Sequence, residues 1–598
     1  MVQIAAGHQG RFAELTATIS RYWQIQGAHA PEGEQVVLVD LQHNDLNCLL
    51  TCLTGAKYLS LTSGAGLVGL IGQNATQRWG GSAADYDAGN VRRLAEAFGV
   101  QVFVPADAAS LLEFTGGRPE VQTAIRADLE RFEQLWATAE DATRWSDVAA
   151  FRCADGLPIG LDVADSVGKV TGDPRPGVEA TELTRALLLE ALQVRAVGHW
   201  VCDTAPVAAY VTSHIGYASW ATMAATVAAR GGVVVHAESL ANGSSYTFIE
   251  PGGPQAGRIA DRRARQLADL FDEVLAVRTG AHDALRAKTA TLLGSPFGPG
   301  GGWWAVDQAS QVDRRPGSAL RASALAKLDV EDRGQPVVYV LSHCLTDVPR
   351  QATNLYEDYH RWLHATLDLA VQLDDRTWVV RFHPWYRMYG EGPTVEAIKR
   401  RYAGHAHIRF DDGVLTKDEY FSSCDVGLTV RGTAALELGR WGIPVIVAGS
   451  SWYERAGFVH CPATVDAYER LLRLPPDQLP ELPGSVDAAL SFSAFTTLLL
   501  PLTGPLLPPL DPYPHTALMA TLAARYRAAT IELDPAFRAV ARAWAGGATA
   551  AVNHDLLAVL HGAGLDVLEG PARAAGERDP AADALQRLLE GWRPVGAR

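Results

Sequence analysis

Short apolar runs alternate with amphipathic segments through the second half of the chain, and the runs stop at small or polar residues. Buried parallel strands have this appearance because helices cover both faces of their sheet. We therefore expect a doubly wound α/β domain over residues 325–480. Its strands are predicted at 337–341, 378–382, 407–410, 426–430 and 444–448, and its helices at 355–373, 395–402, 417–423, 433–441 and 465–472.

The first half of the chain shows the same alternation less regularly, which predicts a second Rossmann-like domain over residues 1–300. A Gly- and Pro-rich segment at 294–302 runs into Trp303 and Trp304 and is the expected linker between the domains. Strands of the first domain are predicted at 36–41, 58–62, 100–104, 196–202 and 232–236, and helices at 9–26, 91–98, 120–139, 181–194, 217–229 and 258–280.

Residues 481–598 are expected to form a helical extension, with helices near 515–529, 534–545 and 553–563. The apolar stretch at 495–510 is broken by four prolines and is shorter than the roughly 20 residues that a membrane helix needs. It is interpreted as a buried or membrane-grazing linker, so peripheral membrane association stays an open alternative.

The composition narrows the class of protein. The chain has 598 residues, which exceeds one core, and a net charge of −15. An acidic balance argues against nucleic acid, because phosphate backbones bind concentrated Lys and Arg. The seven cysteines are odd in number and scattered, which argues against a disulfide framework or a metal site. With no signal-peptide pattern at the start, the expected location is the cytoplasm or the inner face of the membrane.

Residues 64–69 form a Gly-x-Gly-x-x-Gly pattern after the predicted strand at 58–62. In a dinucleotide-binding fold, such a loop is followed by a strand that ends in an acidic residue. Asp85 and Asp87 lie at a suitable distance, but 80–90 is a polar loop rather than a strand. A close turn between strand and helix is therefore favoured over NAD binding.

Candidate ligand residues follow the predicted strands of the second domain. In open α/β sheets, ligands collect outside the carboxyl ends of the strands, and the free N–H groups at a helix start suit a phosphate. This arrangement is typical of a site for a nucleotide sugar. The candidates are Arg381, His383, Pro384 and Arg387 around the strand at 378–382, then Arg431, Gly432, Thr433 and Glu437 after 426–430, and finally Ser450 and Ser451 after 444–448.

Each candidate also has a structural interpretation. His383 donates to a donor phosphate, or it caps neighbouring backbone at the strand end. Glu437 accepts hydrogen bonds from ribose hydroxyls, or it is a solvated helix residue, although burial among its apolar neighbours without a partner would be costly. The Arg431–Thr433 segment forms a phosphate cradle, with its threonine as helix cap in either case. Structural and functional interpretations of Ser450 and Ser451 stand equal.

The spacing of these motifs is similar to that of a known group. The matching stretches are Ser342–Asp347, Tyr359–Trp362, His383-Pro384, Arg431–Glu437 and Gly442–Pro444. Together they resemble bacterial capsule polysaccharide biosynthesis proteins, which include Kdo transferases that act from CMP-Kdo. The resemblance covers about a quarter of the chain, implies a GT-B glycosyltransferase with two Rossmann-like domains facing a cleft, and places His343 in the donor nucleotide site. The stretch Gly156–Asp165 also looks like a recurring feature of that group.

The resemblance further implies transfer of a Kdo- or sialic-acid-like ulosonic acid from a CMP donor to a surface polysaccharide or glycoconjugate. The implied partners are the nucleotide-sugar donor and a glycan or glycolipid acceptor, with no metal or further cofactor, and the oligomeric state stays open. Three alternatives remain: a GT-B enzyme that uses a UDP- or GDP-sugar, a sugar-nucleotide epimerase, and a non-catalytic scaffold in polysaccharide assembly.

The first domain is expected to bind the acceptor and to supply the catalytic group. Asp203 is the candidate base or nucleophile because it ends the predicted strand at 196–202, and His214 and Glu238 are its alternatives. Bacterial sialyltransferases use an acidic motif for the base, and Asp411–Gly413 is similar to it. In this chain the motif follows the His-Pro pair instead of preceding it, so the role is not carried over.

Overall fold

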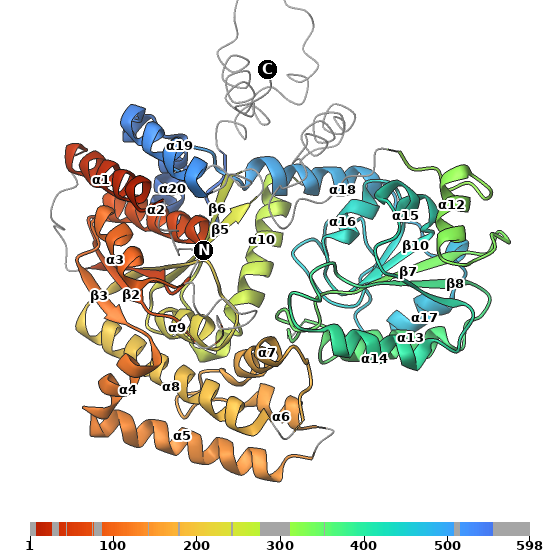
Figure 1. The fold of residues 1–598 in the computed structure, drawn as a ribbon, viewed down its shortest axis with the longest axis horizontal. Helices are drawn as coiled ribbons and strands as arrows, with labels where there is room; N and C mark the ends of the chain where they lie inside the picture. The colour runs from red at the N-terminus through yellow and green to blue at the C-terminus, as the bar shows by residue number, and fades with distance from the viewer. Residues whose placement is uncertain are drawn as a thin grey trace, which may run out of the picture.

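The computed structural model describes residues 8–26, 35–43, 45–74, 76, 86–140, 143–177, 180–240, 243–275, 311–351, 353–507 and 515–553. Two α/β halves lie side by side, with the N-terminal half at the left of Figure 1 and the C-terminal half at the right. The predicted linker at 294–302 and the Trp303-Trp304 pair lie outside the described residues, as does all but the first residue of the predicted helix at 553–563.

The N-terminal half is built on a sheet of order β3-β2-β1-β4-β5-β6. All neighbouring pairs are parallel except β5 and β6, which are antiparallel. From β1 the chain adds strands toward one edge of the sheet, and from β4 it adds them toward the other edge. The carboxyl ends of β1 and β4 therefore form the topological switch point, where such sheets bind ligands. The strands are β1 (Val36–Leu41), β2 (Gly66–Ile71), β3 (Val102–Pro105), β4 (Val207–Thr212), β5 (Val233–Leu240) and β6 (Gly243–Ile249).

Alternate residues of β1 face two different apolar layers. Val37, Val39 and Leu41 pack with α1 (Gln9–Ile25), α2 (Leu46–Ser63) and α3 (Ala88–Ala97). Leu38 points to the opposite layer, which holds residues of α4 (Ala108–Gly116), α8 (Thr181–Thr204) and α9 (Ala218–Ala229). Helices on both faces bury the sheet, as its continuous apolar strands predict.

The glycine pattern at 64–69 forms neither a dinucleotide-binding loop nor a close turn from a strand into a helix. Residues 58–62 belong to the buried helix α2, which ends at Gly64 with a φ of 71°. Gly66 and Gly69 lie in the strand β2 that follows. The predicted strand at 58–62 is therefore wrong, and so is the turn from strand to helix. A helix that is buried on most sides shows the same short apolar run as a buried strand.

The predicted strand at 196–202 is also wrong, because these residues continue helix α8. Val194, Val197 and Val201 recur at helical spacing and pack against the sheet. The strand of this region is β4, and the antiparallel strand β6 was not predicted. As a consequence, Asp203 lies at the end of a helix and not at the end of a strand.

A helical insert joins β3 to β4 and lies below the sheet in Figure 1. Besides α4 and α8 it contains α5 (Pro119–Thr138), α6 (Arg144–Ala150) and α7 (Gly160–Thr171). Gly160 opens α7 against the backbone of Val148 and Phe151, where a side chain would have no space. The stretch at 156–165 thus forms the turn into α7 and the first part of that helix.

The C-terminal half carries a fully parallel sheet of order β11-β10-β7-β8-β9, whose switch point lies between β7 and β10. Every strand and helix predicted between 337 and 472 is confirmed, with boundaries that differ by a few residues. The strands are β7 (Val337–Leu341), β8 (Thr377–Arg381), β9 (Ile408–Asp411), β10 (Val426–Thr429) and β11 (Val445–Val447). The helices are α12 (Ala319–Lys327), α13 (Tyr359–Ala370), α14 (Gly392–Tyr402), α15 (Lys417–Ser423), α16 (Ala434–Gly439) and α17 (Val465–Arg473).

The described part of the predicted extension at 481–598 is divided between the halves. Helix α18 (Ser485–Ala494) packs against the C-terminal half through Ala489 and Phe492. Helices α19 (His515–Ala528) and α20 (Pro535–Gly546) return to the N-terminal half, where they cover α1 and α2 (Figure 1). Tyr58 of α2 donates a 2.5 Å hydrogen bond to Asp534, just before α20.

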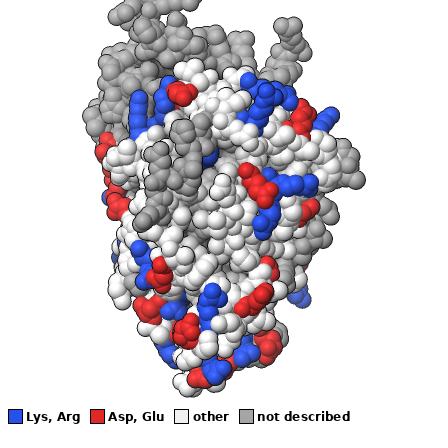
Figure 2. Space-filling view, turned by 90° about the vertical axis from the view of Figure 1, so that its left-hand side faces the viewer, with Lys and Arg blue, Asp and Glu red and all other residues white. Residues whose placement is uncertain are grey.

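The Pro-broken apolar stretch begins with a π-helical turn at Phe495–Leu499, and its described apolar residues are mostly buried. In the parts of the chain that the structure describes, no helix is long and apolar enough to cross a membrane. On the outer face of the N-terminal half, Lys and Arg side chains are interspersed with Asp and Glu (Figure 2).

Candidate active site between the two sheets

The loops after β7 and β10 meet at the switch point of the C-terminal sheet. His343 follows β7, and its Nε2 accepts a 3.2 Å hydrogen bond from the backbone N–H of Arg431, which follows β10. The His343 ring stacks on Tyr359 at 4.2 Å between centroids. Burial lowers the pKa of His343 to about 3, with the Arg431 cation as a second cause. His343 is therefore neutral at pH 7 and holds the loop after β10 in place.

Arg431 and Gly432 form the floor of this site. The Arg431 guanidinium donates to Thr353 Oγ1 at 2.8 Å and to the Ser450 carbonyl, while its buried Nε has no partner among the described residues. A side chain on Gly432 would come within 2.9 Å of Thr429 Oγ1. The loop thus presents backbone and one unused cationic N–H at the switch point.

His383 follows β8 and lies beside the loop after β7. Its Nδ1 accepts a 3.3 Å hydrogen bond from the backbone N–H of Trp385 and lies 3.1 Å from Cys344 Sγ. Burial lowers the pKa of His383, although the Asp347 carboxylate opposes the shift. A neutral imidazole that accepts at Nδ1 carries its proton on Nε2. His383 is thus poised to donate one hydrogen bond from Nε2.

Four of the other predicted donor-site residues are bound to protein partners. Arg381 donates to Asp411 at 2.6 Å, and Glu437 forms an ion pair with Lys417. Thr433 has helical dihedral angles and no capping hydrogen bond from its side chain, so the predicted cap is wrong. The Ser451 hydroxyl accepts from Tyr453, Ser450 contributes its carbonyl to Arg431, and Pro384 and Arg387 are exposed.

The N-terminal switch point carries a stack of rings. His43 follows β1 and His214 follows β4, and their rings stack at 4.8 Å between centroids. Trp220 of α9 also stacks on His214, at 4.6 Å between centroids, and its ring lies 6.2 Å from that of His43. Burial lowers the pKa of His214 well below its usual value, and His43 and Lys169 add to the shift. His214 Nδ1 lies 2.9 Å from Ser213 Oγ.

The other two candidates of this half lie elsewhere. Asp203 ends α8 before β4 begins, which places it at the amino edge of the sheet, and it pairs with Arg230 at the end of α9. Since ligands collect at the opposite edge, the reason for choosing Asp203 no longer holds. Glu238 lies in β5 and forms a 2.7 Å ion pair with Arg263. Of the three, His214 lies at the switch point.

The two carboxyl edges face each other through Asp347. This residue lies in the loop after β7, and its Oδ1 accepts from the Tyr217 hydroxyl at 2.7 Å and from Lys169 Nζ at 3.1 Å. Tyr217 comes from the loop between β4 and α9, and Lys169 from α7. Burial would raise the pKa of Asp347, but Lys169 and Tyr217 outweigh it and lower the pKa. About half of the Asp347 side chain stays open to solvent.

Sequence reasoning missed several of these residues. His43 is the second residue after the predicted strand at 36–41, so the carboxyl-end rule could have found it. Lys169 and Tyr217 gave no such signal, because each reaches the site through a contact with the other half. In the parts of the chain that the structure describes, no group of His, Cys, Asp or Glu is arranged to hold a metal ion.

Neither a protein-family model nor a curated protein matches the sequence. Among solved structures, UDP-GlcNAc 2-epimerase from Neisseria meningitidis is 12% identical, covering 52% of this chain and 82% of that chain at a TM-score of 0.25. HepE of Anabaena in complex with UDP is 10% identical over 77% and 94%, at 0.25. A UDP-glucose: anthocyanidin 3-O-glucosyltransferase in complex with UDP is 9% identical over 83% and 100%, at 0.23.

At these TM-scores the matches carry no argument about the reaction. The fold is assigned from the two sheets themselves: it is GT-B-like, with two Rossmann-like doubly wound halves whose carboxyl edges face each other.

Proposed function

We propose that this protein is a glycosyltransferase that moves a sugar from a nucleotide-sugar donor to a glycan or glycolipid acceptor between the two halves. The observation that carries the proposal is the contact of Asp347 with Tyr217, because it brings the ligand-binding edges of two separate sheets together. One edge then serves the donor and the other the acceptor. A reaction between two bound substrates fits this arrangement.

The donor nucleotide is proposed to bind at the C-terminal switch point. His383 Nε2–H and the unused Nε–H of Arg431 donate to the phosphate that leaves the sugar. Gly432 allows the phosphate to approach the backbone. Because α16 has only six residues, we assign the phosphate to these donors and not to the helix dipole.

We propose a CMP-linked ulosonic acid as the donor. The support is the motif resemblance in this half, together with the charge of Arg431, which suits a sugar that carries its own carboxylate. Arg381 is already paired with Asp411 and Arg387 is exposed, so we assign this carboxylate to the positive charge of Arg431, whose unused Nε–H donates to the phosphate. A UDP- or GDP-sugar transferase and a sugar-nucleotide epimerase are the alternatives that a donor assay separates.

His214 is proposed as the group that removes the proton from the acceptor hydroxyl. In this role its Nδ1–H donates to Ser213 Oγ, and the free Nε2 takes the acceptor proton. The acceptor oxygen attacks the anomeric carbon, the bond from that carbon to the phosphate oxygen breaks, and the phosphate leaves with the electron pair. The nearby Asp347 carboxylate stabilises the imidazolium that forms.

The test is nucleotide release from CMP-, UDP- and GDP-sugars, each with and without a glycan acceptor. A transferase releases nucleotide in proportion to acceptor, with CMP donors favoured. An epimerase converts the donor sugar without acceptor, and a scaffold does neither. His383→Ala should lower release, while Asp203→Asn, at the amino edge of its sheet, serves as the matched control and should not.

A further inference from the structure

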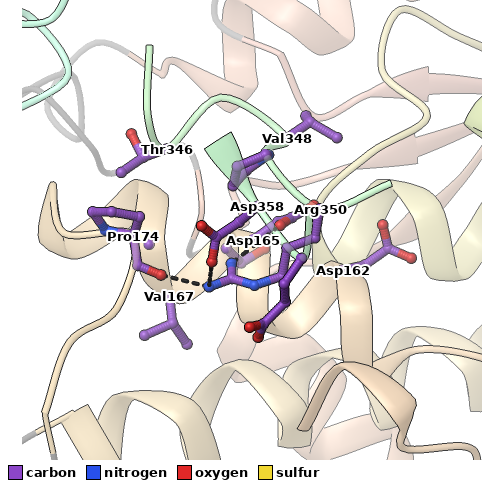
Figure 3. Close-up of polar contacts among 12 residues, drawn as sticks. Asp162, Asp165, Val167, Pro174, Thr346, Val348, Arg350 and Asp358 are labelled. Atoms are coloured by element: carbon purple, nitrogen blue, oxygen red, sulfur yellow. Dashed lines mark hydrogen bonds and ion pairs between the residues drawn. The ribbon is translucent and has the colours of Figure 1, made fainter. Parts of the chain in front are cut away.

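A buried cluster of charged side chains joins the two halves beside the donor site (Figure 3). Arg258, which precedes α10 (Ile259–Leu275), donates to Asp162 and Asp165 of α7, each at 2.8 Å. Arg350 of the C-terminal half donates to Asp165 at 3.3 Å and also to the Pro174 carbonyl. Arg258 in turn donates to the Arg350 carbonyl.

This cluster is costly to build, so its position requires a reason. The side chains of Arg350, Arg258 and Asp165 are 2%, 7% and 0% exposed. Buried ions lose hydration that their mutual attraction repays only when the geometry is good, and a buried ion pair is weak support for stability by itself. Such pairs can instead specify one arrangement of the elements that they join.

The cluster continues to Asp358, the N-cap residue of α13. Arg350 Nη2 lies 3.7 Å from Asp358, and Arg175 Nε donates to the same carboxylate at 2.9 Å. Asp358 caps α13 by accepting from the backbone N–H of Arg361 at 2.7 Å. Both arginines therefore hold the start of α13.

Tyr359, which follows Asp358, connects the start of α13 to the donor site. Tyr359 is the first residue of α13, and its ring stacks on His343. His343 holds the backbone N–H of Arg431, as described above. A continuous set of contacts thus runs from α7 of the N-terminal half, through Arg350, Asp358 and Tyr359, to the loop that carries Arg431.

We propose that Arg350 and Asp165 are positioning residues through which helix α7 of the N-terminal half fixes the donor loop at 429–433. The proposal rests on the function proposed above, since it names what aligns the same donor site. The C-terminal half then has its nucleotide site fully formed only when α7 is docked, so donor affinity depends on the contact between halves.

Arg350→Met and Asp165→Asn are the test variants, with Arg350→Lys as a conservative partner. Arg455→Gln is the matched control, because Arg455 also joins the halves, through a 2.5 Å ion pair with Asp269 of α10, without touching the donor loop. We expect Arg350→Met to weaken CMP binding by roughly tenfold in calorimetry, and Arg455→Gln to leave it unchanged. Arg350→Lys should recover part of the loss.

A double-mutant cycle separates an effect on the position of the donor loop from a general loss of protein stability. Tyr359→Leu, which removes the stacked ring, should weaken CMP binding by a similar factor, and the Arg350→Met/Tyr359→Leu pair should lose much less than the product of the two single effects. If the single variants only lower the melting temperature and the folded protein binds CMP as tightly as wild type, the proposal is overturned.

Hydrogen exchange of the amides at 429–433 supplies a measurement that needs no ligand. Faster exchange in Arg350→Met than in Arg455→Gln supports the proposal, and equal exchange overturns it. A wild-type protein that binds no nucleotide removes the proposed function, while this exchange result still decides whether α7 positions the loop. If Arg350→Met does not fold, Arg175→Gln tests the same contact with Asp358 from the rim of the cluster.

Discussion

The Tyr217 hydroxyl donates a 2.7 Å hydrogen bond to Asp347 Oδ1, which joins the loop after β4 to the loop after β7. Lys169 binds the same oxygen and also lies 3.3 Å from the centre of the Tyr389 ring. One half-exposed carboxylate therefore receives a hydroxyl and a cation from the opposite half, and the two ligand edges are held within reach of one another.

Lys169→Met tests this contact through the pH dependence of stability. Lys169 and Tyr217 lower the folded-state pKa of Asp347, so the stabilisation is present above the unfolded pKa of about 4 and is lost as the pH falls through the folded value. The variant should lose about 1 kcal/mol of unfolding free energy at pH 7, and less at pH 3. Urea unfolding at both pH values measures it. An equal loss at the two values would show that packing, not the ion pair, is what the variant removes.

Glu391→Gln should change the pH dependence of the unfolding free energy in the direction opposite to Lys169→Met. Glu391 is fully buried and accepts from the backbone and hydroxyl of Thr346 at 2.8 and 2.7 Å. Burial raises its pKa to about 7, against the effect of these hydrogen bonds. The folded state therefore holds this proton more tightly, and stability from this group is lost as the pH rises from about 4 to about 7.

Glutamine keeps the acceptor oxygen and cannot ionise. The variant should thus flatten the loss of stability across that pH range, by on the order of 1–3 kcal/mol at pH 8 relative to wild type. Chemical unfolding at pH 5 and pH 8 checks this. Parallel curves for wild type and variant would contradict the raised pKa.

Gly172→Ala should weaken the contact between the two halves at Gly172 and Gly390. Gly172 has a φ of 69°, and a side chain there would lie 2.6 Å from the Gly390 carbonyl oxygen of the C-terminal half. The matched control is Gly231→Ala, at a φ of 92° with open space around it. Both variants strain the backbone by about 1 kcal/mol, but only Gly172→Ala should also lower nucleotide affinity. Equal stability and affinity in the two variants would rule out a close approach of the halves at this point.

His214→Gln should lower the transfer rate by roughly 100-fold or more while nucleotide affinity stays near that of wild type. His214 lies at the N-terminal switch point, away from the loop that holds the phosphate. Glu238→Gln is the control, since Glu238 is paired with Arg263. Single-turnover rates and calorimetry on the same preparations separate the two effects. A reversed result, with Glu238→Gln inactive and His214→Gln active, would move the base to β5.

The second half of the fold could be predicted closely because its strands are parallel and buried, so each appears as an uninterrupted apolar run between helices. The carboxyl-end rule selected Arg431 and Gly432, the family resemblance added His343, and the structure brings the three together at one switch point. It also placed His383 beside them. Local pattern, sheet topology and the resemblance were sufficient to place these residues near one another, and their role in donor binding stays a prediction.

The first half could not be predicted as well, because helix and strand look alike where an element is buried all around. Helix α2 and the end of α8 contain apolar runs as short as a strand, and reading them as strands misplaced Asp203. Contacts between halves had no local signal at all. Lys169 meets Asp347 across 178 positions of sequence, and only the assembled fold shows it.

Calorimetric titration of CMP, UDP, GDP and NAD into wild type and His383→Ala tests most directly whether the C-terminal switch point binds the nucleotide of a sugar donor. We predict that CMP binds most tightly, stabilises the protein by about 2.7 kcal/mol at 100 times its dissociation constant, and loses roughly tenfold or more in affinity in His383→Ala. Asp203→Asn should bind CMP like wild type. Binding of NAD alone, no binding of any nucleotide, or unchanged affinity in His383→Ala would contradict the account.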